Sequence, residues 1–239
     1  MQIIDIHCHV LPGLDDGAQS MDMAERMLEM AYEQGVGAVI ATAHSSRRFR
    51  TEPEEIRRRC AEVEAQIQQR KAQNFRVYPG QEVFFREDVF RELENGTIMT
   101  LAGSRYVLVE FMPDTPYSVI YGAARRFALS GYRMVMAHIE RYECLRNAEN
   151  MDELQKMGIY FQINVHSLMG KWYNRTSRWC KKMLSEQQIH FIASDMHNTD
   201  SRRPQFDAAK QWMESHLDKE YIEDISWRNA WRLINNQKI

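Results

Sequence analysis

The segment Asp5-Ile6-His7-Cys8-His9 places a carboxylate and two imidazoles at alternate positions near the start of the chain. Alternate side chains of a β-strand point to the same face, so His7 and His9 are expected about 6–7 Å apart on one side. Two neighbouring imidazoles can bind one metal ion, and Asp5 would orient one of the rings rather than bind the metal itself. The segment therefore predicts a metal site.

Further imidazoles and carboxylates recur along the chain, mostly where a predicted strand ends. They are Asp16, His44, Glu82, Glu110, His138, Asp195 and His197. Taken singly, His44 is better explained as a core histidine and Glu110 as half of a buried ion pair, because a buried charge is costly unless it is paired. Together with His7 and His9, these groups at equivalent positions favour a site with two or three metal ions.

The types of donor atom limit which metals can bind and which reactions those metals would catalyse. Imidazole nitrogen and carboxylate oxygen without thiolate suit Zn, Mn, Fe or Co. Neighbouring ions of this kind activate water and hold both ends of an in-line phosphoryl displacement, which predicts hydrolysis of a phosphate ester without a covalent intermediate. The cysteines lack the Cys-x5-Arg spacing of thiol-based phosphatases, and Cys8 should point away from the two imidazoles.

The elements that would position these groups alternate between strand and helix. Strands are predicted at Ile3–His9, Ala38–Thr42, Phe75–Tyr78, Tyr106–Phe111, Arg133–Ala137, Ile159–Ile163 and His190–Ala193. Helices are predicted at Met21–Gln34, through Ile56–Ile67, at Tyr117–Leu129 and near 150–157, 175–187, 204–217 and 219–234. This alternation predicts a mostly parallel sheet surrounded by helices, and ligands at the strand ends match the active-site edge of an α/β barrel.

Composition excludes several classes of function. The 239 residues show no linker or repeat, so one domain spanning residues 1–239 is expected. A net charge of -2 argues against binding to nucleic acid or anionic membranes. We expect no transmembrane helix and no signal peptide, because the chain has neither a long apolar run nor a basic leader. Four scattered cysteines indicate reduced thiols and a cytoplasmic protein.

Cationic side chains near the candidate ligands could hold a substrate phosphate. Arg141 follows His138 by three residues, although an ion pair with Glu140 or Glu143 explains it equally well. Arg202 and Arg203 lie beyond His197, and the sequence does not decide which of them points inward. Three more follow His44, where attraction of an anionic substrate and a solvated loop are both open interpretations: Arg47, Arg48 and Arg50.

Three motifs carry a family resemblance. They are Asp5-x-His7-x-His9 continued through Leu11-Pro12-Gly13-Leu14-Asp15-Asp16-Gly17, then His138-Ile139-Glu140-Arg141-Tyr142, and then Ala193-Ser194-Asp195-Met196-His197-Asn198. The first resembles the opening motif of the PHP (polymerase and histidinol phosphatase) superfamily. Together they resemble the manganese-dependent tyrosine-protein phosphatases of bacterial capsular and exopolysaccharide biosynthesis loci, over the chain up to about residue 204.

The resemblance implies a distorted (β/α)7 barrel that holds three divalent metal ions, with Mn expected and Fe, Co or Zn as alternatives. One ion would be held by His7, His9, Glu82 and Asp195. Glu82 would bridge to a second ion, held also by Glu110 and His138. The third would be held by Asp16, His44 and His197, unless Asp15 takes the role of Asp16.

The resemblance also implies a substrate, the tyrosine-phosphorylated tail of a bacterial tyrosine autokinase that controls polysaccharide synthesis. Arg141 and one of Arg202 or Arg203 would bind the phosphate. A metal-bridging hydroxide would attack phosphorus without a phosphoenzyme, and Asp195 or His197 are the candidates for any general acid. The alternatives are a small-molecule phosphatase of the histidinol phosphate type and a non-catalytic barrel that binds partners. The sequence does not give the oligomeric state.

Overall fold

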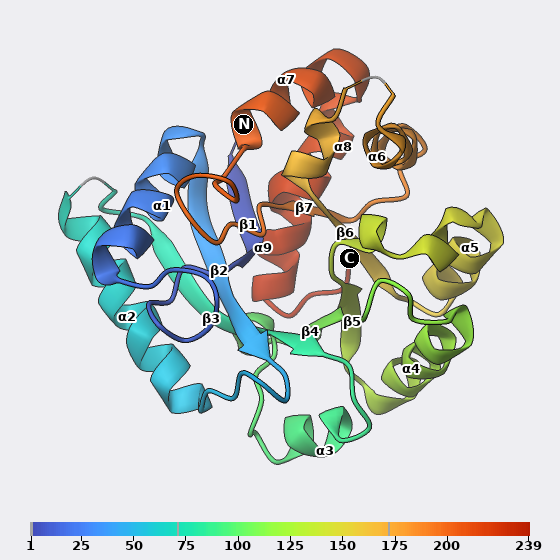
Figure 1. The fold of residues 1–239 in the computed structure, drawn as a ribbon, viewed down its shortest axis with the longest axis horizontal. Coiled ribbons are helices and arrows are strands. Elements are labelled where there is room, and N and C mark those ends of the chain that lie inside the picture. Colours follow the sequence, from blue (N-terminus) through green and yellow to red (C-terminus); the bar gives the residue numbers. More distant parts are fainter. Residues whose placement is uncertain (1, 71, 172) are drawn as a thin grey trace.

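Seven parallel strands follow one another in chain order and form a nearly closed barrel, with helices outside it (Figure 1). The computed structural model describes residues 2–70, 72–171 and 173–239. The strands are β1 (Ile3–Cys8), β2 (Val36–Ser45), β3 (Arg76–Phe84), β4 (Tyr106–Glu110), β5 (Arg133–Met136), β6 (Tyr160–Asn164) and β7 (Phe191–Ala193). The predicted (β/α)7 barrel is therefore confirmed.

Helices connect the strands and cover their outer faces. They are α1 (Met21–Glu33), α2 (Pro53–Arg70), α3 (Val89–Glu94), α4 (Tyr117–Ser130), α5 (Ala148–Lys156) and α6 (Arg175–Ser185). After the last strand come α7 (Phe206–His216), α8 (Lys219–Glu223) and α9 (Asn229–Ile234), of which α9 packs against the inner face of the barrel. The sequence did not predict α3, because six residues are too short to show a helical repeat of apolar positions. The helix predicted over 219–234 is interrupted by a π-helical turn at Asp224–Arg228.

Local sequence explains where the first helix begins and ends. The side chain of Ser20 accepts a hydrogen bond from the backbone N–H of Met23 at 3.2 Å and so caps α1. Gly35 follows the helix with a φ of 94°, a backbone conformation that favours glycine, and lets the chain turn directly into β2. No helix in the described ranges is long and apolar enough to cross a membrane.

Two apolar cores lie on opposite faces of the barrel wall. The larger one packs the outer faces of the strands against the helices, for example through Met27 and Leu28 of α1. The smaller one takes buried residues from every strand except β3 and from α9, including Ile40, Leu108 and Leu233, and the partly buried Tyr78 of β3 packs against it. Figure 1 shows α9 inside the ring of strands. The C-terminal helix therefore fills the end of the barrel opposite the strands' carboxyl ends.

The barrel closes at a seam between β1 and β7. The backbone N–H of Asp195 donates to the carbonyl of His7 at 2.8 Å, and that of His9 donates to Met196 at 2.9 Å. The buried carboxylate of Asp5 accepts from the backbone N–H of Ser194 at 3.0 Å and from its hydroxyl at 2.5 Å. Asp5 therefore joins the two strands.

The prediction that Asp5 orients an imidazole is wrong, because a change of register in β1 disturbs the simple alternation on which it relied. The pairing with β2 shifts between Asp5 and Cys8. Ile6 belongs to the inner core and Cys8 to the outer one, although strict alternation would put them on one face. Within the described residues, the carboxylate of Asp5 accepts a hydrogen bond from the backbone N–H of His7 at 3.3 Å, and not from its imidazole ring.

Because the carboxylate of Asp5 is buried at the seam between β1 and β7, we expect the free energy of unfolding to depend on pH. Burial raises the pKa of Asp5 from 3.8 to about 6, against the opposing hydrogen bonds from Ser194. The folded state thus binds this proton more tightly than the unfolded state does, so the stabilisation is fully present below about pH 4 and is lost as the pH rises through 6.

We expect the free energy of unfolding of the wild type, relative to Asp5→Asn, to fall by about 2 kcal/mol between pH 4 and 7. Urea unfolding of both proteins in chelator measures this difference, and groups common to both cancel. A difference that is constant over this range would contradict the assignment.

Candidate metal centre

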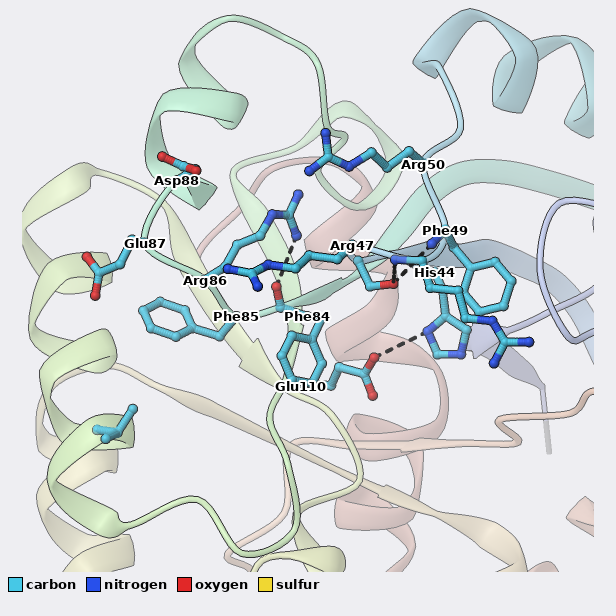
Figure 2. A pocket seen from close by; sticks show the side chains of 13 residues that line it. His44, Arg47, Phe49, Arg50, Phe84, Phe85, Arg86, Glu87, Asp88 and Glu110 are labelled. Atoms are coloured by element: carbon cyan, nitrogen blue, oxygen red, sulfur yellow. Dashed lines mark hydrogen bonds and ion pairs between the residues drawn. The ribbon is translucent and has the colours of Figure 1, made fainter.

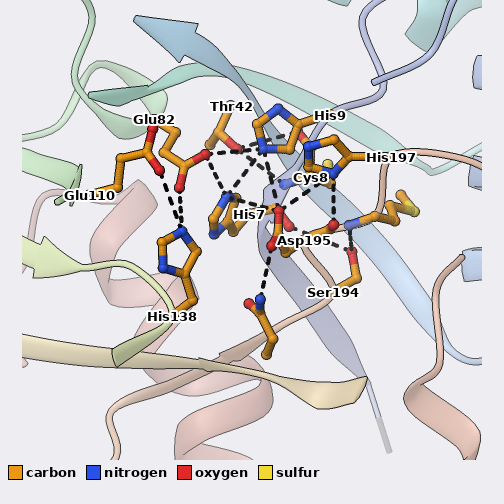
Figure 3. Close-up of polar contacts among 12 residues, drawn as sticks. His7, Cys8, His9, Thr42, Glu82, Glu110, His138, Ser194, Asp195 and His197 are labelled. Carbon is orange, nitrogen blue, oxygen red and sulfur yellow. Dashed lines mark hydrogen bonds and ion pairs between the residues drawn. The ribbon is translucent and has the colours of Figure 1, made fainter. Parts of the chain in front are cut away.

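A cavity of about 710 Å³ lies at the carboxyl ends of β2 and β3, beside β4. His44 and Glu110, two of the predicted metal ligands, form part of its wall, and their side chains point toward each other in Figure 2. Six further predicted ligands converge in Figure 3, namely His7, His9, Glu82, His138, Asp195 and His197. The predicted position of the site at this edge of the barrel is therefore where the donor atoms gather.

Glu82 stands at the centre of the cluster with its carboxylate almost completely buried. One carboxylate oxygen, Oε2, lies 3.1 Å from Nε2 of His7, 3.2 Å from Nε2 of His9 and 3.1 Å from Nδ1 of His44. The other, Oε1, lies 2.8 Å from Nε2 of His138. A single carboxylate thus contacts four imidazoles, as expected of a group that bridges ions.

All nine predicted ligands fall into sets whose donor atoms lie within 4.8 Å of one another. The sets are His7, His9 and Asp195; His7, Glu82 and His138; His44, Glu82 and Glu110; and His9, Asp16, His44 and His197. These sets overlap more than the predicted division into three ions, because His7, His9 and His44, like Glu82, each join two sets. The assignment of particular ligands to particular ions stays a prediction.

Strand register and two unusual backbone conformations bring the donors together. His44 on β2 pairs with Glu82 on β3, and Glu110 on β4 pairs with Phe84, two residues beyond Glu82 on the same face. His138 and Asp195 follow β5 and β7 with positive φ values of 34° and 52°. A left-handed residue is uncommon outside glycine, and such strain is concentrated at functional sites.

Hydrogen bonds orient two of the rings so that Nε2 faces the cluster. Nδ1 of His9 lies 2.7 Å from a carboxylate oxygen of Asp15, and Nδ1 of His7 lies 3.2 Å from the amide oxygen of Gln162. Both partners accept hydrogen bonds, so each ring donates from Nδ1 and turns Nε2 toward the cluster, where a metal ion would take the place of a proton. Asp15 and Gln162 therefore have the orienting role that was predicted for Asp5.

The neighbouring acids Asp15 and Asp16 have different positions. Asp15 is buried and also accepts the backbone N–H of His44 at 3.0 Å. Asp16 is half-exposed, and its carboxylate lies 3.4 Å from His44 and 3.6 Å from His197. Their loop approaches β1 closely at Gly17, where a Cβ atom would lie 2.2 Å from the carbonyl oxygen of His9. The geometry thus favours Asp16 as the ligand.

Gln162 and Asn164 on β6 are functional residues that the sequence analysis missed. Oε1 of Gln162 also accepts the backbone N–H of His138 at 2.8 Å, and its amide donates to Asn164, which in turn donates to Asp195 at 2.9 Å. The signal was the one used for Glu110, a polar side chain inside an apolar strand. It was overlooked because amides are weaker metal ligands than imidazoles and carboxylates.

Charges in the cluster suit divalent cations. Burial alone would lower the pKa of His9, but the carboxylates of Asp15 and Glu82 outweigh it and raise that pKa well above its ordinary value. Burial, followed by the nearby charge of His9, lowers the pKa of His197 to about 2, so this imidazole is neutral. Its Nε2 atom is buried without a hydrogen-bond partner. A neutral nitrogen with a free lone pair, among carboxylates, fits a metal ligand.

Two of the three predicted phosphate-binding arginines reach the cluster. Arg141 and Arg202 lie on opposite sides of Asp195, with N–O distances of 2.6 Å and 2.9 Å to its two carboxylate oxygens. The alternative ion pair of Arg141 with Glu140 or Glu143 is not the one formed. Arg203 is exposed and makes no ion pair within the described ranges, so Arg202 is the inward member of its pair.

Cys8 is unsuited to nucleophilic attack, as predicted. Its thiol is buried in the outer core and donates to the carbonyl of Ile40. Burial, together with nearby acids beginning with Asp5, raises the thiol pKa well above its usual value. A thiolate is therefore disfavoured here, and the thiolate is the reactive form.

The family described as capsular polysaccharide synthesis, CpsB/CapC, matches residues 3–235. The chain belongs to this family. Among its relatives, the tyrosine-protein phosphatase CpsB of Streptococcus pneumoniae is 33% identical over 244 residues, covering 99% of this chain and 100% of that protein. The tyrosine-protein phosphatase YwqE of Bacillus subtilis is 30% identical over 239 residues, covering 99% and 93%.

Structural comparison agrees with the family assignment. A match comes from the crystal structures of YwqE from B. subtilis and CpsB from S. pneumoniae, described as unique metal-dependent tyrosine phosphatases. The TM-score is 0.88 at 28% identity, covering 99% of this chain and 96% of the other. The CpsB/CapC barrel is therefore preserved over the length of the chain.

The amide of Gln162 predicts an effect on metal affinity. Gln162→Met keeps the side-chain length but removes the acceptor for the His7 ring and for the backbone of His138, so affinity for Mn²⁺ should fall about 10- to 100-fold. Titration calorimetry of the chelated protein measures this. Gln155→Met on α5, outside the cluster, is the matched control and should bind as the wild type. Equal affinities for both variants would remove Gln162 from the site.

Proposed function

We propose that this chain is a metal-dependent protein-tyrosine phosphatase that acts on the tyrosine-phosphorylated tail of a bacterial tyrosine kinase in capsular or exopolysaccharide synthesis. The activity of the CpsB and YwqE relatives supports this proposal. The decisive observation in the chain itself is the cluster of imidazoles and carboxylates around Glu82, bordered by Arg141 and Arg202. We infer three divalent ions, with Mn favoured over Fe, Co or Zn.

Bound ions would supply an activated water and offset charge on the phosphoryl oxygens. The predicted ligands would hold them as His7, His9, Glu82 and Asp195; Glu82, Glu110 and His138; and Asp16, His44 and His197. Glu82, with contacts on both carboxylate oxygens, is suited to the bridging position between two of these sets.

Arg141 and Arg202 would bind the phosphate of the substrate. Both guanidinium groups are about one-third exposed while held against Asp195, so their free N–H groups are available at the mouth of the cluster. Guanidinium groups form short, charge-assisted hydrogen bonds with phosphate oxygens. They would orient the phosphoryl group and offset the charge that is redistributed in the transition state.

Direct hydrolysis is favoured over a phosphoenzyme, because Cys8 is buried with a raised thiol pKa. Tyrosinate is a moderate leaving group, with a phenol pKa of about 10, so strong acid catalysis is unnecessary. Asp195 and His197 remain the candidates for any general acid. The described cysteines are free thiols, which supports a cytoplasmic location.

Substrate comparison tests the proposed activity. Protein stripped with chelator should be inactive, and addition of Mn²⁺, Fe²⁺, Co²⁺ or Zn²⁺ should restore hydrolysis, with Mn²⁺ expected to restore most. The restored enzyme should cleave a phosphotyrosyl peptide with a higher kcat/KM than histidinol phosphate. Preference for histidinol phosphate would support the small-molecule alternative, and full activity without metal would reject the mechanism.

The two adjacent arginines provide a matched pair of variants. Arg202→Ala should lower kcat/KM for a phosphotyrosyl peptide about 10- to 100-fold, the range for loss of a hydrogen bond to a charged group. Arg203→Ala should leave kcat/KM close to that of the wild type, because its side chain is exposed and forms no ion pair with the described residues. Metal content measured on both variants separates loss of phosphate binding from loss of metal. Equal losses of activity would refute the role of Arg202.

A further inference from the structure

The cavity beside the metal centre has an aromatic wall and a cationic rim. Phe49, Phe84 and Phe85 supply the rings, and arginines on the loop after β2 lie around them (Figure 2). The rim arginines are Arg47, Arg48 and Arg50, all exposed. The volume of the cavity, about 710 Å³, lies within the range of about 300–1,000 Å³ that is usual for ligand pockets.

This cavity is continuous with the proposed metal site. The ring of His44 stacks on that of Phe49, with centroids 5.7 Å apart and planes inclined by 17°. On its other side, Nδ1 of His44 lies 3.3 Å from Glu110, which also lines the cavity. The group attached to a phosphate held at the cluster would therefore extend along the phenylalanine wall.

The positive charge of the rim is not neutralised by neighbouring acids. Arg47, Arg48 and Arg50 make no ion pair with any residue in the described ranges, and Arg48 lies over the ring of Phe49 at 5.0 Å. The acids at the far end of the cavity already have partners, since Glu87 pairs with Arg126 and Asp88 with Arg91.

Arg86 differs from the rim arginines because it is largely buried and structural. It donates to the carbonyl of Ser45 at 3.0 Å and pairs with Glu92. It therefore fixes the start of the loop that carries the rim. Of the arginines that line the cavity, Arg47, Arg48 and Arg50 are therefore the ones that form no ion pair with a described residue. They make this loop locally positive, although the chain as a whole has a net charge of -2.

We propose that this cavity is the subsite for the leaving group and its peptide, with the tyrosyl ring against Phe49 and Phe84 and the rim arginines bound to acidic residues beside the phosphotyrosine. The inference rests on the proposed phosphatase activity and adds the class of peptide. Packing of aromatic rings against one another stabilises a complex, and exposed guanidinium groups attract carboxylates with a strength that falls as the salt concentration rises.

Charge reversal tests the rim. Arg47→Glu/Arg50→Glu should lower kcat/KM about tenfold for a phosphotyrosyl peptide with flanking aspartates, since each exposed ion pair contributes up to about 1 kcal/mol and reversal adds repulsion. A peptide with glutamines in place of the aspartates should be hydrolysed nearly as by the wild type. Arg57→Glu/Arg178→Glu, on exposed positions of α2 and α6, makes the same change of net charge away from the cavity and should affect neither peptide.

A second variant tests the aromatic wall. Phe84→Ala should lower kcat/KM for phenyl phosphate about tenfold, the size expected from loss of about one aromatic contact, and should spare ethyl phosphate. Damage to the metal centre would reduce hydrolysis of both esters equally, so the ratio of the two rates reports the subsite alone.

The outcomes separate this inference from the proposed function. If the Mn²⁺-loaded wild type hydrolyses phosphotyrosyl peptides but treats acidic and glutamine-flanked peptides alike, and Phe84→Ala lowers both esters equally, the subsite is refuted and the phosphatase stands. If the wild type hydrolyses no phosphomonoester, the proposed function itself fails. Loss of acidic-peptide preference in the rim variant alone, with phenyl phosphate selectively lost in Phe84→Ala, supports the subsite.

Discussion

The buried carboxylate of Glu82 is the constraint around which this protein is arranged. Four imidazoles contact its two oxygens in a place that water does not reach. An isolated buried charge would be strongly unfavourable, so the surrounding donors are tolerable only as a mutually paired set or around cations. Because these donors come from strands distributed around the barrel, the fold and the cluster depend on each other.

The rest of the barrel holds this cluster rigidly. Asp5 and Ser194 join the first and last strands directly beneath the ligands, and α9 fills the opposite end of the ring. Around the cluster, amide and carboxylate partners orient the rings, and Gln162 connects His7 to the backbone of His138. The site is therefore supported by strands, while the arginines at its mouth lie beyond the strand ends, Arg141 in a short 3-10 helix after β5 and Arg202 in a turn after β7.

The alternation of strands and helices predicted a parallel sheet covered by helices, and the family resemblance implied the seven-stranded barrel. The residues that converge could be predicted because polar side chains stand out at the ends of apolar strands. The sequence could not predict the roles of Asp5 and Asp15, which depend on a shift of register within β1 and on a loop that returns over His9. The choice between Arg202 and Arg203 depends on the geometry of a loop, which the periodicity of apolar residues does not predict. Gln162 was missed since an amide in a strand has no charge that demands a partner.

The left-handed backbone at His138 and Asp195 has an evolutionary consequence. An L-residue in this conformation costs roughly 1–2 kcal/mol, whereas glycine adopts it freely. Drift toward greater stability would therefore favour glycine at both positions, and only the need for their side chains opposes it. In a lineage that no longer needs the catalytic activity, these two positions should be among the first to be substituted. A glycine at either position would therefore indicate a pseudoenzyme descended from this barrel.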